Sequence, residues 1–147
     1  MIIKSNDLKK TNLELNKIFL FYGKNEGLKK DTINNLLLNK NEIFYYDEKE
    51  ILDNKEIFFN TILSKSLFEK EKIIIIKRAT DKILQSIEEL SSNNLEDIII
   101  IINASNLEKK SKLRSYFEKN KKYVCTAFYL DTEQTLSKLA YTFLKEK

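Results

Sequence analysis

The run Ile98-Ile99-Ile100-Ile101-Ile102 is the stretch of this sequence that decides the fold. It shows no alternation with polar residues, and the shorter run Ile73–Ile76 has the same character. A strand that is apolar at every position needs cover on both faces, which is typical of a parallel sheet between two layers of helices. We therefore predict that these two runs are the central strands of an α/β domain.

Three further apolar runs, rich in aromatic and β-branched residues, extend the predicted parallel sheet to five strands in a three-layer arrangement. The predicted strands are Lys17–Tyr22, Glu42–Tyr46, Lys72–Lys77, Asp97–Ile102 and Tyr123–Leu130. The segments between them carry apolar residues at helical spacing, so each offers one apolar stripe to the sheet. These stripes contain Leu28, Ile33, Leu36 and Leu37; Ile51, Phe58, Phe59, Ile62 and Leu63; Ile83, Leu84, Ile87 and Leu90; and Leu113, Tyr116 and Phe117.

Residue pairs with capping-box spacing or its close relative predict where three of the helices start. They are Asp47 with Glu50, Ser105 with Glu108, and Asp131 with Gln134. The last predicted helix covers about 132–146, and its apolar stripe is unusually strong for the end of a chain. It either closes the core of this domain or packs on a partner outside the sequence.

The composition excludes several classes of protein. At 147 residues the chain fits one domain with one core. No apolar run approaches the roughly 20 residues that span a bilayer and no signal-peptide pattern is present, so we expect a cytoplasmic protein. With no histidine and a single cysteine, Cys125, we expect no metal site, no cofactor and no Ser-His-Asp or Cys-His catalytic arrangement.

The two glycines of the chain, Gly23 and Gly27, lie in one loop where a predicted strand passes into a predicted helix. A phosphate-binding loop occupies this position in P-loop proteins, but there the second glycine is followed by lysine and then serine or threonine. Here Leu28 and Lys29 follow Gly27. We therefore interpret Gly23 and Gly27 as a degenerate phosphate loop that forms the backbone hinge of the turn.

A P-loop enzyme also needs an acidic residue at the end of a later central strand to hold magnesium. The strand Ile73–Ile76 is followed instead by Lys77 and Arg78. The two defects agree with each other, so we predict no catalytic residues. A divergent nucleotide-binding enzyme remains the alternative, and saturable binding of ATP with magnesium would reveal it.

A third interpretation follows from the net charge of +4. A nucleic-acid-binding module could use the basic residues that cluster between two predicted strands, although a solvated helix face explains the same cluster. The cluster is Lys109, Lys110, Lys112, Arg114, Lys119, Lys121 and Lys122.

A possible protein-binding feature lies in the segment Ser64–Glu71, where Leu67 and Phe68 are ringed by charged residues. Exposed aliphatic and aromatic side chains that fill a partner's pocket are common interface anchors. The other interpretation is that both side chains fold back into the core, as large apolar residues usually do.

Taken together, the chain resembles the N-terminal domain of the delta subunit of the bacterial DNA polymerase III clamp loader over nearly its whole length. The matching segments, in order, are Phe19–Gly23, Ser66–Phe68 leading into Ile73–Lys77, Ile99–Ser105, Leu107–Leu113 and Leu136–Leu144. The resemblance implies an AAA+-type α/β fold without working nucleotide motifs. It also implies that this domain is not an ATPase.

The resemblance further implies a partner and a site. Delta binds the sliding clamp through a Leu-Phe pair after its second helix and holds one interface of the ring open for loading onto primed DNA. By position that pair is Leu67 and Phe68, with Ser66 beside it. Residues 1–131 would form the clamp-binding domain, and 132–147 would begin a truncated lid domain. The other clamp-loader subunits would be partners only of a full-length protein.

Overall fold

The computed structural model describes residues 1–147 except 14, 39, 41, 65–70, 131, 132, 146 and 147. Five strands form one sheet in the order β2-β3-β4-β1-β5, and every neighbouring pair is parallel. This confirms the predicted parallel five-stranded sheet. The strands are β1 (Ile18–Tyr22), β2 (Ile43–Asp47), β3 (Lys72–Ala79), β4 (Ile98–Ala104) and β5 (Val124–Ala127).

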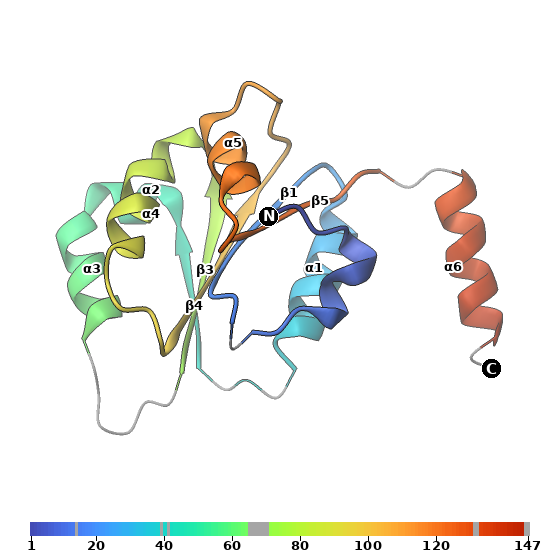
Figure 1. Ribbon diagram of the computed structural model, residues 1–147, viewed down its shortest axis with the longest axis horizontal. Helices are drawn as coiled ribbons and strands as arrows, with labels where there is room; N and C mark the ends of the chain where they lie inside the picture. The colour runs from blue at the N-terminus through green and yellow to red at the C-terminus, as the bar shows by residue number, and fades with distance from the viewer. Residues whose placement is uncertain (14, 39, 41, 65–70, 131–132, 146–147) are drawn as a thin grey trace.

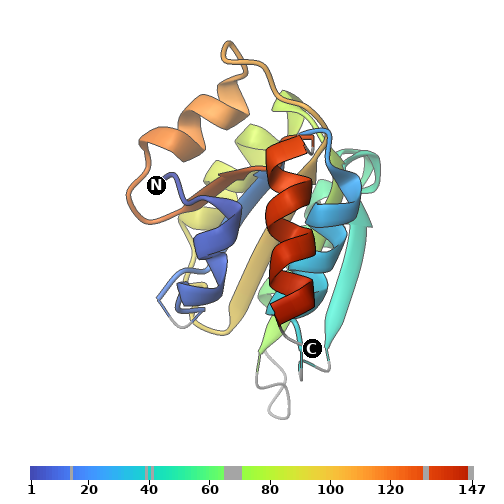
Figure 2. The ribbon, with the colours of Figure 1, turned by 90° about the vertical axis from the view of Figure 1, so that its right-hand side faces the viewer.

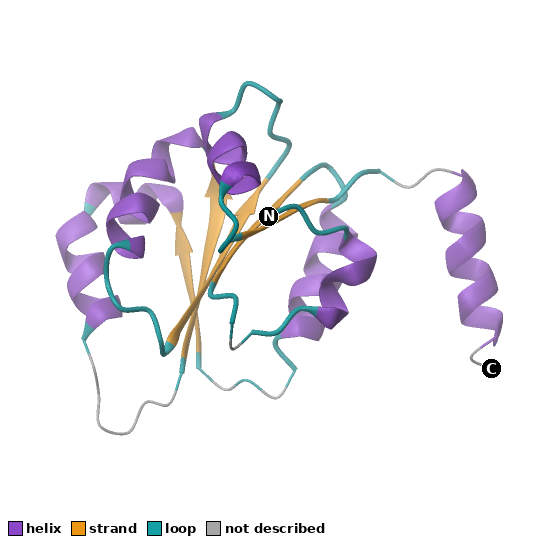
Figure 3. Cartoon of the chain, viewed as in Figure 1, coloured by secondary structure: helices purple, strands orange, loops and turns teal. Residues whose placement is uncertain are grey.

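Helices cover both faces of the sheet (Figures 1 and 3). The short helix η1 (Ser5–Lys10) and α1 (Glu26–Leu36) lie on one face, where Leu8 and Ile33 belong to one apolar cluster. The opposite face carries the second apolar cluster. The helices that contribute to it are α2 (Glu48–Asp53), α3 (Lys55–Leu63), η2 (Asp81–Ile83), α4 (Leu84–Ser91) and α5 (Lys112–Lys119).

The isoleucine runs alternate between the two cores. Ile73 and Ile75 belong to the α1 side, whereas Ile74 and Ile76 belong to the side covered by α2 to α5. Each of these side chains is at most 2% exposed. Because both faces of the sheet are buried along Ile73–Ile76, no position of this run tolerates a polar side chain, which is why the sequence shows no alternation there.

Three sequence predictions need correction. The second helical segment breaks into α2 and α3 at Asn54, whose backbone (φ −136°, ψ 50°) leaves the helical region. The last strand ends at Ala127 rather than at Leu130, which is exposed. Helix α5 starts after Ser111, whose hydroxyl accepts a bond from the Arg114 N–H. Ser105 therefore caps no helix.

One predicted capping box has the expected hydrogen bond. The backbone N–H of Asp47 donates to the Glu50 carboxylate at 3.3 Å, where α2 begins. The pair Asp131 and Gln134 cannot be compared in this way, because residue 131 lies outside the described residues.

The last helix, α6 (Glu133–Lys145), stands apart from the body of the domain (Figure 1). Figure 2 looks from that side and shows α6 in front of η1 and α1. Its apolar side chains Leu136, Tyr141, Phe143 and Leu144 are each more than half exposed. Among the described residues, no side chain of α6 belongs to either apolar cluster. The interpretation that α6 closes the core of this domain is therefore wrong for the described residues.

Candidate functional site

The predicted anchors Ser66, Leu67 and Phe68 lie outside the described residues. The two ends of their segment, Ser64 and Glu71, are described. Ser64 follows the last residue of α3, and Glu71 precedes the first residue of β3. The two ends of the segment therefore lie at the edge of the sheet where the parallel strands begin.

Lys72 ties the two ends of this segment together. Its side chain is almost buried, with the residue 9% exposed, and its ammonium donates to the carbonyls of Ser64 at 2.7 Å and Thr61 at 3.2 Å. These carbonyls belong to the end of α3, where a positive charge also complements the helix dipole. The first residue of β3 is thus bonded to the last turn of α3, which fixes the separation of the two ends.

Glu71 makes a second attachment at the same edge. Its carboxylate lies 2.6 Å from the Lys40 ammonium and 3.6 Å from that of Lys17, and all three side chains are only partly exposed. Lys17 precedes β1 and Lys40 follows α1, so the contacts connect the start of β3 to two other parts of the domain. Sequence reasoning missed Glu71 and Lys72. The only signal was a lysine directly before an isoleucine run.

An apolar surface lies beside the first end of the segment. A hollow of about 150 Å³ next to Ser64 is lined by Phe44, Tyr46, Thr61, Ile62, Ser64, Lys72 and Ile74. On the edge strand β2, Phe44 is 38% exposed and Tyr45 is 56% exposed. A partner that contacts the segment would therefore meet apolar side chains of the edge strand next to it.

The predicted degenerate phosphate loop lies at the opposite edge of the sheet, where the strands end. Gly23 has φ +124°, and its N–H donates to the Ser105 carbonyl at 2.8 Å. A Cβ atom at residue 23 would lie 2.1 Å from the Phe128 carbonyl oxygen. Gly27 is different, because its φ is ordinary and a Cβ there would meet no atom closer than 4.0 Å. Only Gly23 is required by the local packing.

A buried lysine occupies the space beneath this loop. The Lys29 side chain is fully buried, and its ammonium donates to the Ala104 carbonyl at 2.6 Å and to the Glu26 carboxylate at 2.7 Å. Parallel α/β sheets bind ligands at the edge where their strands end. Here the chain's own Lys29 ammonium donates hydrogen bonds at that edge. The sequence signal for this buried lysine was its position four residues before Ile33 and eight before Leu37, both of which are buried.

Two cations near the end of β3, Lys77 and Arg78, both turn toward the edge strand β2. The pairing of β3 with β4 shifts register between Ile76 and Ala79, and Arg78 has a positive φ of 55°. The Arg78 guanidinium forms an ion pair with Asp47, and the Lys77 ammonium lies 5.5 Å from the centre of the Tyr45 ring. The position expected for a magnesium-binding acid thus carries a basic bulge.

Other candidate sites show no reactive arrangement. Cys125 is buried, and burial raises the pKa of its thiol to about 12, so it stays protonated near neutral pH. The described residues contain no group of three or more potential ligands that could hold a metal ion. None of the helices in the described part of the chain has the length and apolar character needed to cross a membrane.

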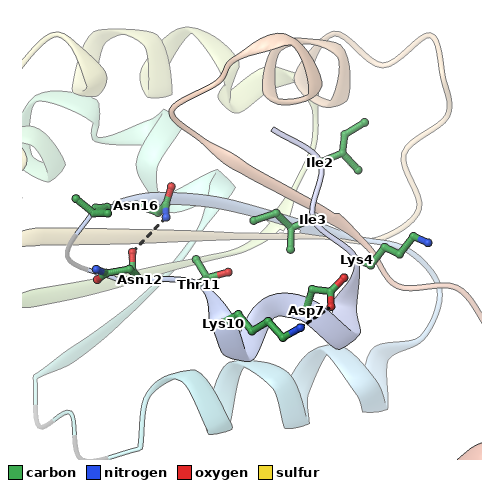
Figure 4. A pocket seen from close by; sticks show the side chains of 9 residues that line it. Ile2, Ile3, Lys4, Asp7, Lys10, Thr11, Asn12 and Asn16 are labelled. Carbon is green, nitrogen blue, oxygen red and sulfur yellow. Dashed lines mark hydrogen bonds and ion pairs between the residues drawn. The ribbon is translucent and has the colours of Figure 1, made fainter.

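Another hollow, of about 650 Å³, lies on the surface formed by residues 2–16 (Figure 4). Its polar groups bond among themselves: the Asn16 amide donates to the Asn12 carbonyl at 3.2 Å, and the Lys10 ammonium lies 3.8 Å from Asp7. The one carboxylate in its lining, Asp7, is exposed to solvent and lies beside a lysine, so nothing there activates it as a base. We therefore do not place catalysis in this hollow.

Comparison with known proteins agrees with the geometry. The family described as DNA polymerase III, delta subunit matches residues 19–127. The fold is similar to that of the Bacillus subtilis DNA clamp loader delta protein, with a TM-score of 0.70 and 14% sequence identity. That match covers 96% of this chain and 46% of the longer chain, so this sequence spans about half the length of the solved structure. A search of curated proteins found no significant match.

Proposed function

The chain belongs to the DNA polymerase III delta subunit family, and from this membership we propose that it binds the replicative sliding clamp and holds the ring open for loading onto primed DNA. The observation that carries the proposal is the family match over residues 19–127, which includes the whole segment between α3 and β3. The family is a component of the clamp loader and not a catalytic enzyme. For this chain we propose the same role, without ATP hydrolysis.

We place clamp contact on Leu67 and Phe68, with Ser66 beside them. The attachments of Lys72 and Glu71 support this placement, because they hold both ends of the short segment and so reduce the conformational entropy lost on binding. The exposed Phe44, which lines the hollow next to Ser64, would border the contact. Binding opens a ring only if the open form is bound more tightly than the closed form.

We propose that residues 1–131 are the clamp-binding unit and that α6 begins a helical lid domain. The exposed apolar side chains of α6 support this division, because they need a cover that the described residues do not supply. In a longer protein, the remaining domains would join the other clamp-loader subunits in the cytoplasm.

The 147-residue chain should bind its cognate sliding clamp saturably in a calorimetric titration. A titration with ATP and magnesium under the same conditions should give no saturable heat. Absence of clamp binding by the folded chain would contradict the proposal. Micromolar ATP binding would favour the divergent nucleotide enzyme, since the sequence alone leaves that alternative open.

Replacing Lys72 with methionine should weaken clamp binding while Leu67 and Phe68 remain in place. The variant keeps the apolar stem but leaves the Thr61 and Ser64 carbonyls without their charged donor. Hydrogen bonds to a charged group contribute about 1.5–3 kcal/mol, so the free energy of unfolding should fall by about that amount. Chemical denaturation and clamp titration below the unfolding transition test both effects. Unchanged clamp affinity would show that the attachment does not position the anchors.

A further inference from the structure

The first residues of the chain pair with the outer edge of strand β5. The Cys125 N–H donates to the Met1 carbonyl at 2.8 Å, and the Ile3 N–H donates to the Cys125 carbonyl at 3.0 Å. Ile2 and Cys125 form a parallel bridge, so residues 1–3 continue the sheet beyond β5. Pairing on both sides of β5 covers an edge that would otherwise present open backbone groups. It also places the N-terminus beside α5 (Figures 1 and 2).

The α-ammonium of Met1 makes three further bonds, which together with this backbone pairing we call the N-terminal clasp. The ammonium donates to the carbonyls of Phe117 and Tyr123, each at 2.9 Å, and to the Asn120 carbonyl. An ammonium group has three N–H donors, whereas a peptide nitrogen has one. Every donor of the Met1 nitrogen therefore has an acceptor, and a peptide nitrogen in the same place could satisfy only one of the three carbonyls.

The three carbonyls lie at the end of α5, where a positive charge is favourable. Phe117 belongs to the last turn of the helix, Asn120 is its C-cap, and Tyr123 directly precedes β5. The last carbonyls of a helix have no partner within it, and the helix dipole places partial negative charge there. The Met1 ammonium supplies both the donors and the charge. The clasp thus joins the N-terminus to the turn between α5 and β5.

Side-chain packing fixes the register of the clasp. Met1 and Ile3 are partly buried and pack against the apolar cluster on the α1 side of the sheet. Ile2 lies between them in the sequence and is 67% exposed. A slip of this segment by one residue would exchange the buried and exposed positions. A residue added before Met1 therefore cannot bring its own ammonium to the three carbonyls by sliding along β5.

We propose that the three carbonyls form a site selective for an unblocked α-ammonium, so that in a chain beginning at Met1 the clasp closes only after any N-terminal formyl or acetyl group has been removed. Such a group turns the ammonium into an uncharged amide with one N–H donor, which leaves two of the three carbonyls without a donor. Removal of a formyl group is a hydrolysis. Water cleaves the C–N bond, formate leaves, and the nitrogen becomes the ammonium that the site binds.

The test compares three forms of the 147-residue chain: with a free Met1 amine, with N-formyl-Met1, and with one glycine added before Met1. Because burial lowers the pKa of this amine below its usual value, the measurements are made at about pH 6, where the ammonium form predominates. Loss of bonds from a charged donor should lower the midpoint of thermal unfolding of both blocked forms by about 4–8 °C. The Cys125 N–H, which donates to the Met1 carbonyl, should exchange with solvent about tenfold faster or more, whereas the amides of α1 should change less.

The matched control is Lys122→Gln, at an exposed lysine of the turn that the clasp contacts. It removes one positive charge and leaves the Met1 amine untouched, so both readouts should stay as in the free form. A blocked form that keeps the unfolding midpoint and the exchange rate of the free form would overturn the proposal. Equal losses in the Lys122→Gln variant would also overturn it, since the effect would then be one of net charge. Neither readout involves the sliding clamp, so the result is independent of the proposed function.

Discussion

Alanine at both Leu67 and Phe68 is expected to abolish measurable binding to the sliding clamp. Full burial of such a side chain contributes about 1.5–3 kcal/mol, so loss of both should remove about 3–6 kcal/mol. Since each 1.4 kcal/mol is tenfold in affinity, the dissociation constant should rise by about 100-fold or more. Isothermal titration of the double variant and of the unmodified chain against the same clamp measures this change.

A matched control comes from the opposite flank of the domain. Ile2 and Leu15 are 67% and 79% exposed and border the shallow hollow of Figure 4, so alanine at both removes a similar apolar area from a surface with no proposed role. This control should bind the clamp like the unmodified chain. If it weakens binding as much as the Leu67 and Phe68 changes do, the loss is not specific to the proposed site.

Two other outcomes would contradict the assignment of the anchors. A double variant that keeps its affinity would exclude Leu67 and Phe68 as the contact. A double variant that loses its helical circular dichroism signal would instead show that the two side chains belong to the core, as the alternative interpretation of the sequence holds. Thermal unfolding of the variant without the clamp separates this case, since exposed anchors contribute little to the stability of the free domain.

The fold could be predicted from the sequence because burial on both faces leaves a pattern that few other arrangements produce. The runs Ile73–Ile76 and Ile98–Ile102 fill two cores at once, and they became the adjacent strands β3 and β4. The break between α2 and α3 could not be predicted in this way, because the apolar stripe continues across Asn54 while the backbone does not. The spacing of apolar residues along the sequence does not reveal the backbone geometry of a single asparagine.

The site was less predictable, and the reason is again physical. In the sequence, Leu67 and Phe68 stand out as apolar residues among charged ones, but their proposed role in clamp contact is inferred from family membership. Lys72 and Lys29 act through backbone carbonyl groups, among them those of Ser64 and Ala104, that only the folded chain brings near. A buried lysine looks like a surface lysine in a sequence unless it interrupts an apolar stripe. Lys29 interrupts an apolar stripe, so its burial could be detected in the sequence. Lys72 only stands at the start of a strand, so its burial could not.

Alanine at Gly23 and alanine at Gly27 are expected to have opposite effects, although the sequence suggested one shared role as a hinge. At Gly23 the added Cβ would overlap the Phe128 backbone, with its oxygen only 2.1 Å away, at a φ of +124° that side chains rarely adopt. A strained backbone alone costs about 1–3 kcal/mol, and displacing Phe128, the residue after β5, adds to it. We expect the free energy of unfolding to fall by about 4 kcal/mol, which is large for a single substitution.

Gly27 lies in the first turn of α1, is exposed, and has open space where a Cβ would project. Alanine there should leave stability unchanged or raise it by up to about 1 kcal/mol, because alanine is the better helix former. Denaturant unfolding of the two variants side by side measures the difference. Equal destabilisation would mean that both glycines are constrained, as in a loop whose backbone closes around a phosphate. The expected asymmetry instead means that Gly23 remains because Phe128 packs on it, while residue 27 is free to carry a side chain.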